Sequence, residues 1–324
     1  MRFVVVGAGA IGGFLGGFLA RAGQEVTLVA RGAHLESMRR HGLRVRSAEG
    51  EFTVRPRCTD DLGAVAEAEV AFLAVKAHAI APMAPALGAA LGDTVTLVTL
   101  QNGIPWWYFQ RHGGPLDGTV LETVDPGGVI GRHIGAARVV GAVTYPATRV
   151  VEPGVVEHVE GTRFTIGELD STRSQRCRAI SAALASSGLR CPVRTDIRKE
   201  IWLKLIGNAV FNPLSALTRA SMSAIATEPR TRAVALALMR EAAGVADALG
   251  VGLDLTVEQR LEGAAEVGEH KTSMLQDVEA GRPLEVDALV GAVVEVGRLA
   301  GLELPRLETV YACVKLLDRA LREG

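Results

Sequence analysis

The chain has 324 residues, of which 48% are hydrophobic and 22% charged, and its formal net charge is −1. This length is enough for one large domain or two ordinary domains with well-buried cores. A charge near zero excludes the general attraction to nucleic acid or to an anionic membrane that a basic protein has, so any anionic ligand must be held by local groups. No run approaches the ~18 apolar residues of a membrane span.

The number and spacing of the cysteines indicate whether the protein is expected in a reducing or an oxidising compartment. The four cysteines lie far apart in the sequence, and no pair has the spacing of metal ligands; they are Cys58, Cys177, Cys191 and Cys313. Their number alone would allow disulfides, but scattered reduced thiols are typical of a cytosolic protein. Arg2 is followed at once by the apolar run Phe3–Val6, which indicates a strand rather than a secretion signal. We therefore expect a soluble cytoplasmic protein without a metal site.

The first part of the chain alternates short apolar runs with helical stretches. The predicted strands are Phe3–Val6, Glu25–Ala30, Val70–Val75 and Thr94–Thr99, and the predicted helices between them are Ile11–Ala22, Ala33–Arg40 and Ala79–Leu91. Strands that are buried on both faces and separated by helices are typical of a parallel, doubly wound sheet. A shorter hairpin, Leu43–Arg46 with Glu51–Arg55, is predicted at the edge of this sheet.

The composition changes twice further along the chain. The segment Val139–Ile166 is β-rich, and it is followed by a polar helix around Thr172–Ser186 and a predicted strand at Leu189–Val193. Beyond Asp196, strand-like alternation disappears and helical spacing continues to the end. The sequence therefore predicts an α/β protein with an N-terminal Rossmann-type doubly wound sheet (residues 1–195) and a C-terminal all-helical domain (residues 196–324).

A glycine-rich turn links the first predicted strand to the first predicted helix. Its sequence is Gly7-Ala8-Gly9-Ala10-Ile11-Gly12. In this pattern the first glycine allows a tight turn, the second lets the backbone approach a pyrophosphate, and the third lets the helix pack closely on the sheet. The free N–H groups at the helix start then face the phosphates. The pattern alone is weak, but its position between a strand and a helix predicts a dinucleotide site.

The end of the second strand indicates which dinucleotide is bound. An NAD enzyme usually has Asp or Glu there, about 20 residues past the glycines, to accept the ribose 2′-hydroxyl. This chain has Ala30-Arg31-Gly32 instead. A guanidinium without a carboxylate suits the 2′-phosphate of NADP, whereas the alternative is a plain surface arginine. We expect NADP. We consider His34 as an aid to this site but prefer to interpret it as a solvated histidine at a helix start.

Two more strand ends carry polar side chains. Lys76 follows Val75, and Asn102 lies in the sequence Leu100-Gln101-Asn102-Gly103. Ligands of such sheets bind beyond the carboxyl ends of the strands. We therefore expect Lys76 and Asn102 to reach the cofactor or the substrate, although elsewhere such residues would be ordinary loop residues.

The segment after Asp196 contains an apolar helix with a polar stripe. Lys204, Asn208 and Asn212 are spaced i, i+4, i+8, so they lie on one helix face, and Pro213 is expected to end the helix. The alternatives are a lysine that reaches out to water and asparagines that cap the helix or bond within the core. Buried polar groups are costly without partners, so three aligned groups favour a pocket.

A second polar segment follows, from His270 to Asp287. Ser273 and Asp277 share a helix face. The sequence Gly281-Arg282-Pro283 breaks the helix, which puts Glu285 in the first turn of a new one, either as a functional carboxylate or as an ordinary helix-start glutamate.

The ordered motifs GAGAIG, VKAH, LQNG, KLIGNAVFNPLSAL and TSMLQDVEAGRPLEVD together resemble the ketopantoate reductase (2-dehydropantoate 2-reductase) family over nearly the whole chain. The resemblance implies an NADPH-dependent reduction of 2-dehydropantoate to pantoate, a step of pantothenate biosynthesis. Hydride would reach C2 of the oxo acid, and the nicotinamide would face a cleft between the two domains.

The resemblance also implies roles for single residues. Lys204 matches the proton donor, and Glu285 matches a residue that contacts the cofactor and helps to set the lysine. Asn208 and Asn212 match contacts to the hydroxyl end of the substrate, and Ser273 matches a carboxylate contact shared with Asn102. The matching cofactor positions are the glycine-rich turn, Arg31, Lys76, Asn102, Ala147 and Glu285.

Some residues depart from the family pattern. Met222, His270 and Ala79 stand where polar residues or asparagine are common, and Trp106-Trp107-Tyr108-Phe109 is unusually aromatic. The aromatic segment could wall the cleft, form a subunit contact or pack in the core. These departures leave open a reductase of another small 2-oxo or 3-oxo acid, or a non-catalytic NADP-sensing module. We also consider a homodimer through the apolar helical half.

Overall fold

The computed structural model describes residues 1–266, 268–269 and 271–323, so His270 lies outside the described residues. The chain divides into two compact units. The N-terminal unit comprises Met1–Gln101, Trp106–Val120 and Gly127–Ile197. The helical unit comprises Asn102–Pro105, Leu121–Pro126 and the chain from Arg198 onward. Two short segments of the first half of the sequence therefore belong to the helical unit, which the sequence did not indicate.

The main sheet of the N-terminal unit has seven strands in the order β5-β2-β1-β6-β7-β8-β11. Neighbouring strands from β5 to β8 are parallel, and β11 is antiparallel to β8. Read along the chain, the first six strands have the order 3-2-1-4-5-6 of the Rossmann fold, which confirms the predicted fold class. The strands are β1 (Arg2–Val6), β2 (Glu25–Val29), β5 (Arg57–Thr59), β6 (Val70–Leu73), β7 (Thr96–Thr99), β8 (Val139–Thr144) and β11 (Phe164–Glu168).

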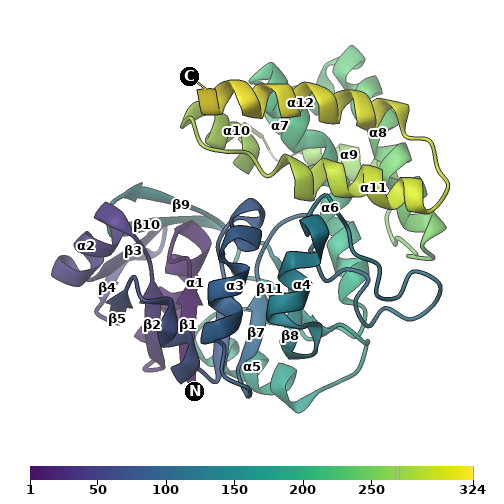
Figure 1. The fold of residues 1–324 in the computed structure, drawn as a ribbon. Helices are drawn as coiled ribbons and strands as arrows, with labels where there is room; N and C mark the ends of the chain where they lie inside the picture. Colours follow the sequence, from purple (N-terminus) through teal and green to yellow (C-terminus); the bar gives the residue numbers. More distant parts are fainter. Residues whose placement is uncertain (267, 270, 324) are drawn as a thin grey trace. The chain divides into compact units, whose positions relative to one another are not determined.

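Helices connect these strands (Figure 1). The α-helices of the N-terminal unit are α1 (Ala10–Arg21), α2 (Gly32–His41), α3 (Ile80–Ala90), α4 (Val129–Ile134) and α5 (Gln175–Ser186). Short 3-10 turns are η1 (Leu62–Glu67), η2 (Ala77–Ala79), η3 (Pro126–Gly128) and η4 (Ala136–Arg138). Each predicted strand and helix of the first hundred residues is present, with ends that differ by at most two residues.

The predicted hairpin forms, but not at the edge of the main sheet. Its strands β3 (Leu43–Ser47) and β4 (Gly50–Val54) belong to a second, four-stranded sheet of order β4-β3-β10-β9. In this sheet β3 pairs in parallel with β10 (Val155–Glu160), which pairs antiparallel with β9 (Ala147–Glu152). The pairing partner of β3 lies about a hundred residues further along, so local sequence patterns could not reveal it.

Helix α1 lies between the two sheets because two rows of glycines leave room on two of its faces. A Cβ atom on Gly12 or Gly16 would meet Val5 or Leu28 of the main sheet. A Cβ atom on Gly13 or Gly17 would come within 3 Å of Val156 or Val45 of the second sheet. The four glycines therefore explain how the second sheet covers the helix that follows the glycine-rich turn.

The predicted strand at Leu189–Val193 is wrong. The segment makes only the isolated bridges Arg163–Arg190 and Ile166–Val193 beside β11. Pro192 has no N–H to donate, and its carbonyl accepts a hydrogen bond from Ile166 at 3.0 Å. The segment therefore runs along the sheet edge without becoming a strand.

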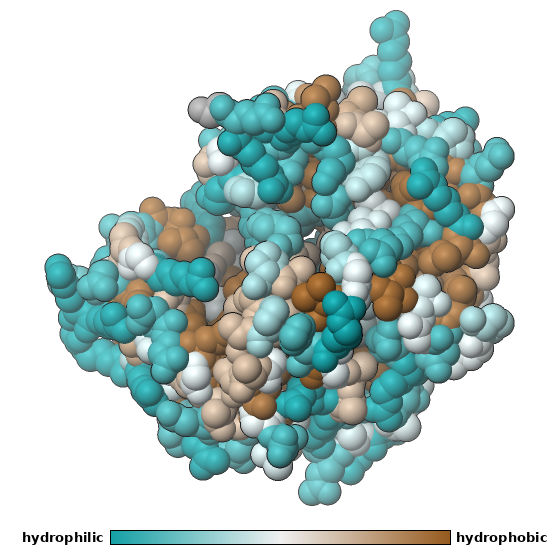
Figure 2. Space-filling view, viewed as in Figure 1, coloured by the Kyte–Doolittle hydropathy of each residue, from teal (hydrophilic) through white to brown (hydrophobic). Residues whose placement is uncertain are grey.

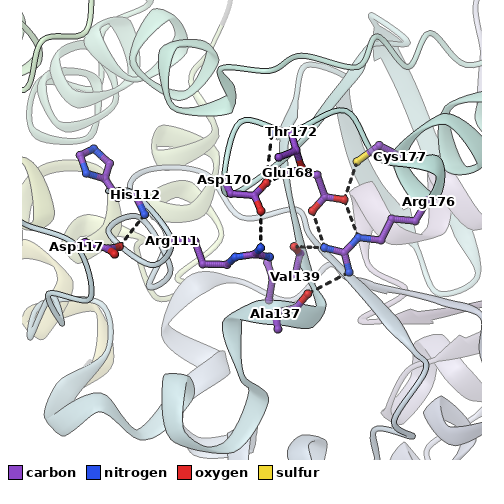
Figure 3. A network of polar contacts seen from close by, with 10 residues as sticks. All are labelled: Arg111, His112, Asp117, Ala137, Val139, Glu168, Asp170, Thr172, Arg176 and Cys177. Carbon is purple, nitrogen blue, oxygen red and sulfur yellow. Dashed lines mark hydrogen bonds and ion pairs between the residues drawn. The ribbon is translucent and has the colours of Figure 1, made fainter. Parts of the chain in front are cut away.

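The aromatic segment is part of the core of the N-terminal unit. Trp106, Trp107, Tyr108 and Phe109 are each at most 3% exposed, and the Trp107 indole N–H donates to Thr99 Oγ1 at 2.8 Å. Arg111, just beyond, forms an ion pair with Asp170 after β11 (Figure 3). Of the three interpretations of this segment, core packing is therefore the one that the structure supports.

The helical unit contains only helices among its described elements, as the sequence predicts. They are α6 (Ile197–Thr218, whose first residue belongs to the N-terminal unit), α7 (Met222–Thr227), α8 (Pro229–Ala248), α9 (Val257–Glu266), α10 (Ser273–Glu279), the π-helical turn η5 (Asp287–Gly291), α11 (Ala292–Leu299) and α12 (Pro305–Glu323). In Figure 1 most of this unit is green to yellow.

The prediction that Pro213 ends the helix with the polar stripe is wrong, because α6 continues to Thr218. Pro213 costs the helix one hydrogen bond. The helix nevertheless continues because residues on both sides of the proline are buried: Phe211 is 2% and Ala216 1% exposed. Asn212 therefore lies within the helix rather than at its end.

Within the described part of the chain, none of the helices combines the length and apolarity that crossing a bilayer requires. On the face shown in Figure 2, hydrophobic residues form separate patches among hydrophilic ones. The four cysteines are unpaired, with Cys177 and Cys191 buried.

Candidate active site

The glycine-rich turn has the geometry of a phosphate-binding loop. The N–H groups of Gly7 and Ala8 both donate to the Val29 carbonyl at 3.0 Å, which fixes the turn to the end of β2. Gly7 has φ +95°, and a Cβ atom there would lie 2.7 Å from a Val75 methyl group. A Cβ atom on Gly12 would lie 2.2 Å from the Gly7 carbonyl oxygen. Neither position can hold a larger residue without moving the backbone.

Gly9 differs from its two neighbouring glycines. It is exposed, it caps α1, and a Cβ atom there would meet no protein atom within 4 Å. The side that a Cβ would occupy is therefore open at the start of α1, where N–H groups have no partner in a preceding turn. This arrangement fits the pyrophosphate of a dinucleotide, because a bare backbone beside open space lets an anion approach the helix N-terminus.

The end of β6 lies beside this turn, since Val75 is the residue that Gly7 contacts. The Gln101 side chain donates to the carbonyls of Leu73 and Val75 at 2.7 and 2.9 Å, and so ties the end of β7 to the end of β6. Lys76 follows directly and is half-buried. The ends of β1 and β6 flank the position where the strand order reverses, which is where such sheets bind ligands.

Arg31 and Ala147 lie elsewhere in the N-terminal unit. Arg31 is the exposed N-cap residue of α2, and Ala30 separates it from the end of β2. Ala147 begins β9 in the second sheet, so it is not at a strand end of the main sheet. The structure thus brings the glycine turn and the Val75-Lys76 strand end together, and it places Arg31 two residues beyond the end of β2.

The most informative contact of the helical unit joins two residues that the sequence singled out separately. The Lys204 ammonium donates to Asn102 Oδ1 at 2.6 Å, and both side chains are half-buried. Lys204 lies in the middle of α6, whereas Asn102 lies in the short segment that follows β7. Because Asn102 is neutral, this bond can orient the ammonium without cancelling its charge.

The Asn102 segment is held firmly within the helical unit. Ile104 N–H donates to the Ala288 carbonyl at 2.9 Å. Gly103 has φ +87°, and a Cβ atom there would lie 2.2 Å from the same carbonyl oxygen. The carboxylate of Glu295 accepts from the N–H groups of Glu122 and Thr123 at 2.7 and 2.9 Å, which fixes the other inserted segment.

Glu285 lies three residues before Ala288. It immediately precedes the helical turn that begins at Val286, and its carbonyl accepts from Leu289 N–H at 3.2 Å. Glu285 therefore lies just before this turn, whereas the sequence predicted it within the first turn. Because Ala288 bonds to the Asn102 segment, Glu285 belongs to the same part of the helical unit as the Lys204–Asn102 pair.

Helix α6 carries the complete polar stripe. Asn208 is half-buried, and Asn212 is only 4% exposed. Among the described residues, the buried Nδ2 of Asn212 has no hydrogen-bond partner. Such a group costs about 1–3 kcal/mol when left unpaired, so it is a natural contact for a bound ligand.

Ser273 is exposed at the start of α10, and its neighbour Thr272 connects it to α6. The Ser215 hydroxyl donates to the Asn212 carbonyl at 3.0 Å and shares a 2.5 Å hydrogen bond with Thr272 Oγ1. Asp277, on the same short helix, is instead paired with Arg282 at 2.9 Å. Sequence reasoning missed Ser215 and Thr272, because short hydroxyl residues are common in helices and caps.

The interpretation of His34 as a solvated histidine is wrong. His34 is half-buried and not solvated, because its ring bonds to both the Ala8 carbonyl and the Gly154 N–H. Within the described residues, no three His, Cys, Asp or Glu side chains are grouped as metal ligands would be.

Known proteins resemble the chain along its whole length. Two family models match: ketopantoate reductase PanE/ApbA over residues 3–171, and its C-terminal domain over residues 196–318. The 2-dehydropantoate 2-reductase of Mesorhizobium japonicum is 48% identical over 98% of both chains. A crystal structure from Ralstonia solanacearum, provisionally named a ketopantoate reductase, has 37% identity and a TM-score of 0.93 over 99% of this chain and 98% of that one.

A more distant structure shares the fold. The ternary structure of D-mandelate dehydrogenase with NADH and anilino(oxo)acetate matches with a TM-score of 0.84 over 99% of this chain and 100% of that one, at 20% identity. At this identity the likeness concerns the fold alone. The two family models and the 48% identity over nearly the whole length show more: the chain belongs to the ketopantoate reductase family of oxidoreductases.

Proposed function

We propose that this protein reduces 2-dehydropantoate to pantoate with NADPH, with Lys204 as the proton donor. The observation that carries the proposal is the 2.6 Å hydrogen bond from Lys204 to Asn102 in a chain of this family. It places a half-buried ammonium, oriented by a neutral partner, in the unit that also carries the polar stripe of α6. Bound NADPH supplies the hydride that attacks C2 of the oxo acid.

The N-terminal unit would hold the dinucleotide. The open side of Gly9 and the N-terminus of α1 would bind the pyrophosphate. Arg31 would bind the 2′-phosphate, because a guanidinium matches a phosphate with charge-assisted hydrogen bonds. Lys76, Ala147, Asn102 and Glu285 would provide the remaining cofactor contacts.

Lys204 would act on the ketone oxygen. Hydride addition turns this oxygen into an alkoxide, whose developing charge an adjacent ammonium stabilises and then protonates. Asn102 fixes the direction of the ammonium, and the Asn102 segment is itself fixed by Ala288. Glu285, just before the same helical turn, would help to set the lysine.

The remaining polar residues would bind the two ends of the substrate. Ser273, with Asn102, would bind the carboxylate, and Asn208 and Asn212 would bind the hydroxyl. The unpaired Nδ2 of Asn212 supports this role, because a substrate hydroxyl would provide the acceptor that the protein does not.

The substrate is tested by measuring NADPH oxidation with a panel of 2-oxo acids: 2-dehydropantoate, pyruvate, 2-oxoisovalerate and the 2-oxo acid of mandelate. We expect the highest kcat/KM for 2-dehydropantoate, since only this acid has both a carboxylate for Ser273 and a hydroxyl for the two asparagines. A higher value for another acid would establish the alternative reductase. Binding of NADPH without turnover of any acid would favour the sensing module.

The preference for NADP is tested by Arg31→Ala. We expect the KM for NADPH to rise by about tenfold or more, because a charge-assisted contact is lost, whereas the KM for NADH should not change. Arg39→Ala is the matched control: it removes an exposed arginine of the same helix, which pairs with Asp60 at 3.0 Å. Equal losses for both dinucleotides would refute the phosphate contact.

Two further proposals concern the state of the protein in the cell. The four unpaired cysteines support a cytoplasmic location. The homodimer stays a prediction, and light scattering on the purified protein tests it.

A further inference from the structure

His34 lies on α2 and makes two hydrogen bonds that the proposed function does not use. Its Nε2 lies 2.8 Å from the Ala8 carbonyl oxygen, in the glycine-rich turn. Its Nδ1 accepts from the N–H of Gly154 at 2.9 Å, in the tight turn between β9 and β10. Figure 1 shows α2 beside these two strands. One half-buried imidazole thus connects the turn to the second sheet.

The two partners fix the chemical state of the ring. A backbone N–H can only donate, so Nδ1 must be the unprotonated nitrogen, and a carbonyl can only accept, so Nε2 must carry the proton. His34 is therefore the neutral Nε2–H tautomer. Burial lowers its pKa from the ordinary value of 6.5, although the bond to Ala8 opposes this change.

The bond to Ala8 also fixes the next N–H group. In a planar trans peptide the C=O and the N–H point in opposite directions, and the described chain has no cis peptide bond. Since the Ala8 carbonyl points to His34, the Gly9 N–H points the other way. Ala8 is 1% exposed whereas Gly9 is exposed beside open space, which agrees with this orientation.

We infer that His34 is a positioning residue of the dinucleotide site, which holds the Ala8–Gly9 peptide so that the Gly9 N–H faces the cofactor pyrophosphate. The inference rests on the proposed dinucleotide binding at this turn. The Val29 carbonyl fixes the two N–H groups before this peptide, but the peptide itself has His34 as the partner of its carbonyl. Without the imidazole, this peptide can rotate and turn its carbonyl oxygen toward the phosphate.

The test compares His34→Ala, His34→Gln and Ser37→Ala by NADPH titration and steady-state kinetics. Ser37 is the matched control, because its hydroxyl joins the same helix to the same turn at the Pro153 carbonyl, at 2.7 Å, without touching Ala8. For His34→Ala we expect Kd and KM for NADPH to rise about 3- to 10-fold, with kcat unchanged. Glutamine has one donor group and one acceptor group and should restore most of the affinity, whereas Ser37→Ala should bind like wild type.

Two outcomes would overturn the inference. One is unchanged NADPH affinity in His34→Ala, and the other is an equal loss in Ser37→Ala, which would indicate only a structural role of α2. If His34→Ala does not fold, ¹⁵N NMR of the histidines in the wild-type protein decides instead: a His34 ring that is protonated at Nδ1 contradicts the inference. Failure of the proposed function would look different, because the wild-type protein itself would then not bind NADPH.

Discussion

Glu168 is a buried carboxylate of the N-terminal unit that pairs with Arg176. Its side chain is 3% exposed, and it accepts from Arg176 Nε and Nη2 at 2.7 and 2.5 Å (Figure 3). Arg176 also donates to the carbonyls of Ala137 and Val139, so it fastens α5 to β8 and β11. Burial alone would raise the pKa of Glu168, but the hydrogen bonds from Arg176 and Ser174 and the charge of Arg176 hold it below the ordinary value.

Replacing Arg176 should therefore destabilise the protein in a pH-dependent way. At neutral pH we expect Arg176→Met to lose about 3–5 kcal/mol of unfolding free energy, because it leaves a buried carboxylate unpaired. The depressed pKa of Glu168 means that its ionised form stabilises wild type above pH 4.5, and that this contribution is lost as the pH falls through the folded-state pKa. The difference between variant and wild type should shrink on acidification.

Urea unfolding at neutral and at acidic pH measures this difference. Arg178→Met is the control, since Arg178 is an exposed residue of the same helix and its loss should cost little at either pH. A difference of the same size at both pH values would show that Arg176 contributes packing rather than charge.

At the scale of elements, the Asn102 segment needs a glycine at position 103. Gly103 combines φ +87° with a Cβ position 2.2 Å from the Ala288 carbonyl oxygen, whereas Gly118 has φ +77° with no atom within 4 Å. Both alanine variants suffer backbone strain of about 1 kcal/mol, but only Gly103→Ala must also move Ala288 or the segment itself. We expect Gly103→Ala to lose clearly more stability than Gly118→Ala, together with kcat, because Asn102 moves away from Lys204.

Thermal unfolding and kcat of the two variants check this expectation. If Gly103→Ala retained both the unfolding temperature and the kcat of Gly118→Ala, the segment would be more adaptable than its contacts indicate.

The sequence predicts elements well where the signal is local. Strands β1, β2, β6 and β7 and the turn from Gly7 to Gly12 follow from apolar runs and glycine spacing, and the structure has them. The sequence predicts elements poorly where residues far away in the chain determine which structure forms. The hairpin joins a second sheet because β3 pairs with β10, and α6 continues through Pro213 because both of its sides are buried. The segment Leu189–Val193 runs beside β11 alone, and Pro192 has no N–H to donate. The segment therefore forms only isolated bridges.

The same distinction applies to the candidate site. The stripe of Lys204, Asn208 and Asn212 is visible as a spacing, because all three residues lie on one helix. The pairing of Lys204 with Asn102 is not visible, since the two residues are 102 positions apart in the sequence. His34 was misjudged for this reason too: its partner Gly154 is 120 positions away.

At the scale of the whole molecule, the two units are interleaved along the chain rather than consecutive. The helical unit takes Asn102–Pro105 and Leu121–Pro126 from the first half of the sequence. These segments provide Asn102 and Ile104, and the N–H groups that Glu295 binds. We therefore expect a fragment that begins at Arg198 to lack part of its own fold and to unfold with lower cooperativity than the full chain. Circular dichroism during heating tests this, and a sharp transition at the full-length temperature would contradict it.

The central claim is that Lys204, oriented by Asn102, supplies the proton in the reduction of a 2-oxo acid. The most direct measurement is kcat of Lys204→Met with NADPH and 2-dehydropantoate, beside the NADPH affinity of the same variant. Lys199→Met is the control, since Lys199 lies on the same helix and pairs with Asp254 at 2.8 Å. We predict that Lys204→Met loses about a hundred- to ten-thousand-fold in kcat while NADPH binds as before, and that Lys199→Met keeps its kcat. An unchanged kcat in Lys204→Met would contradict the account.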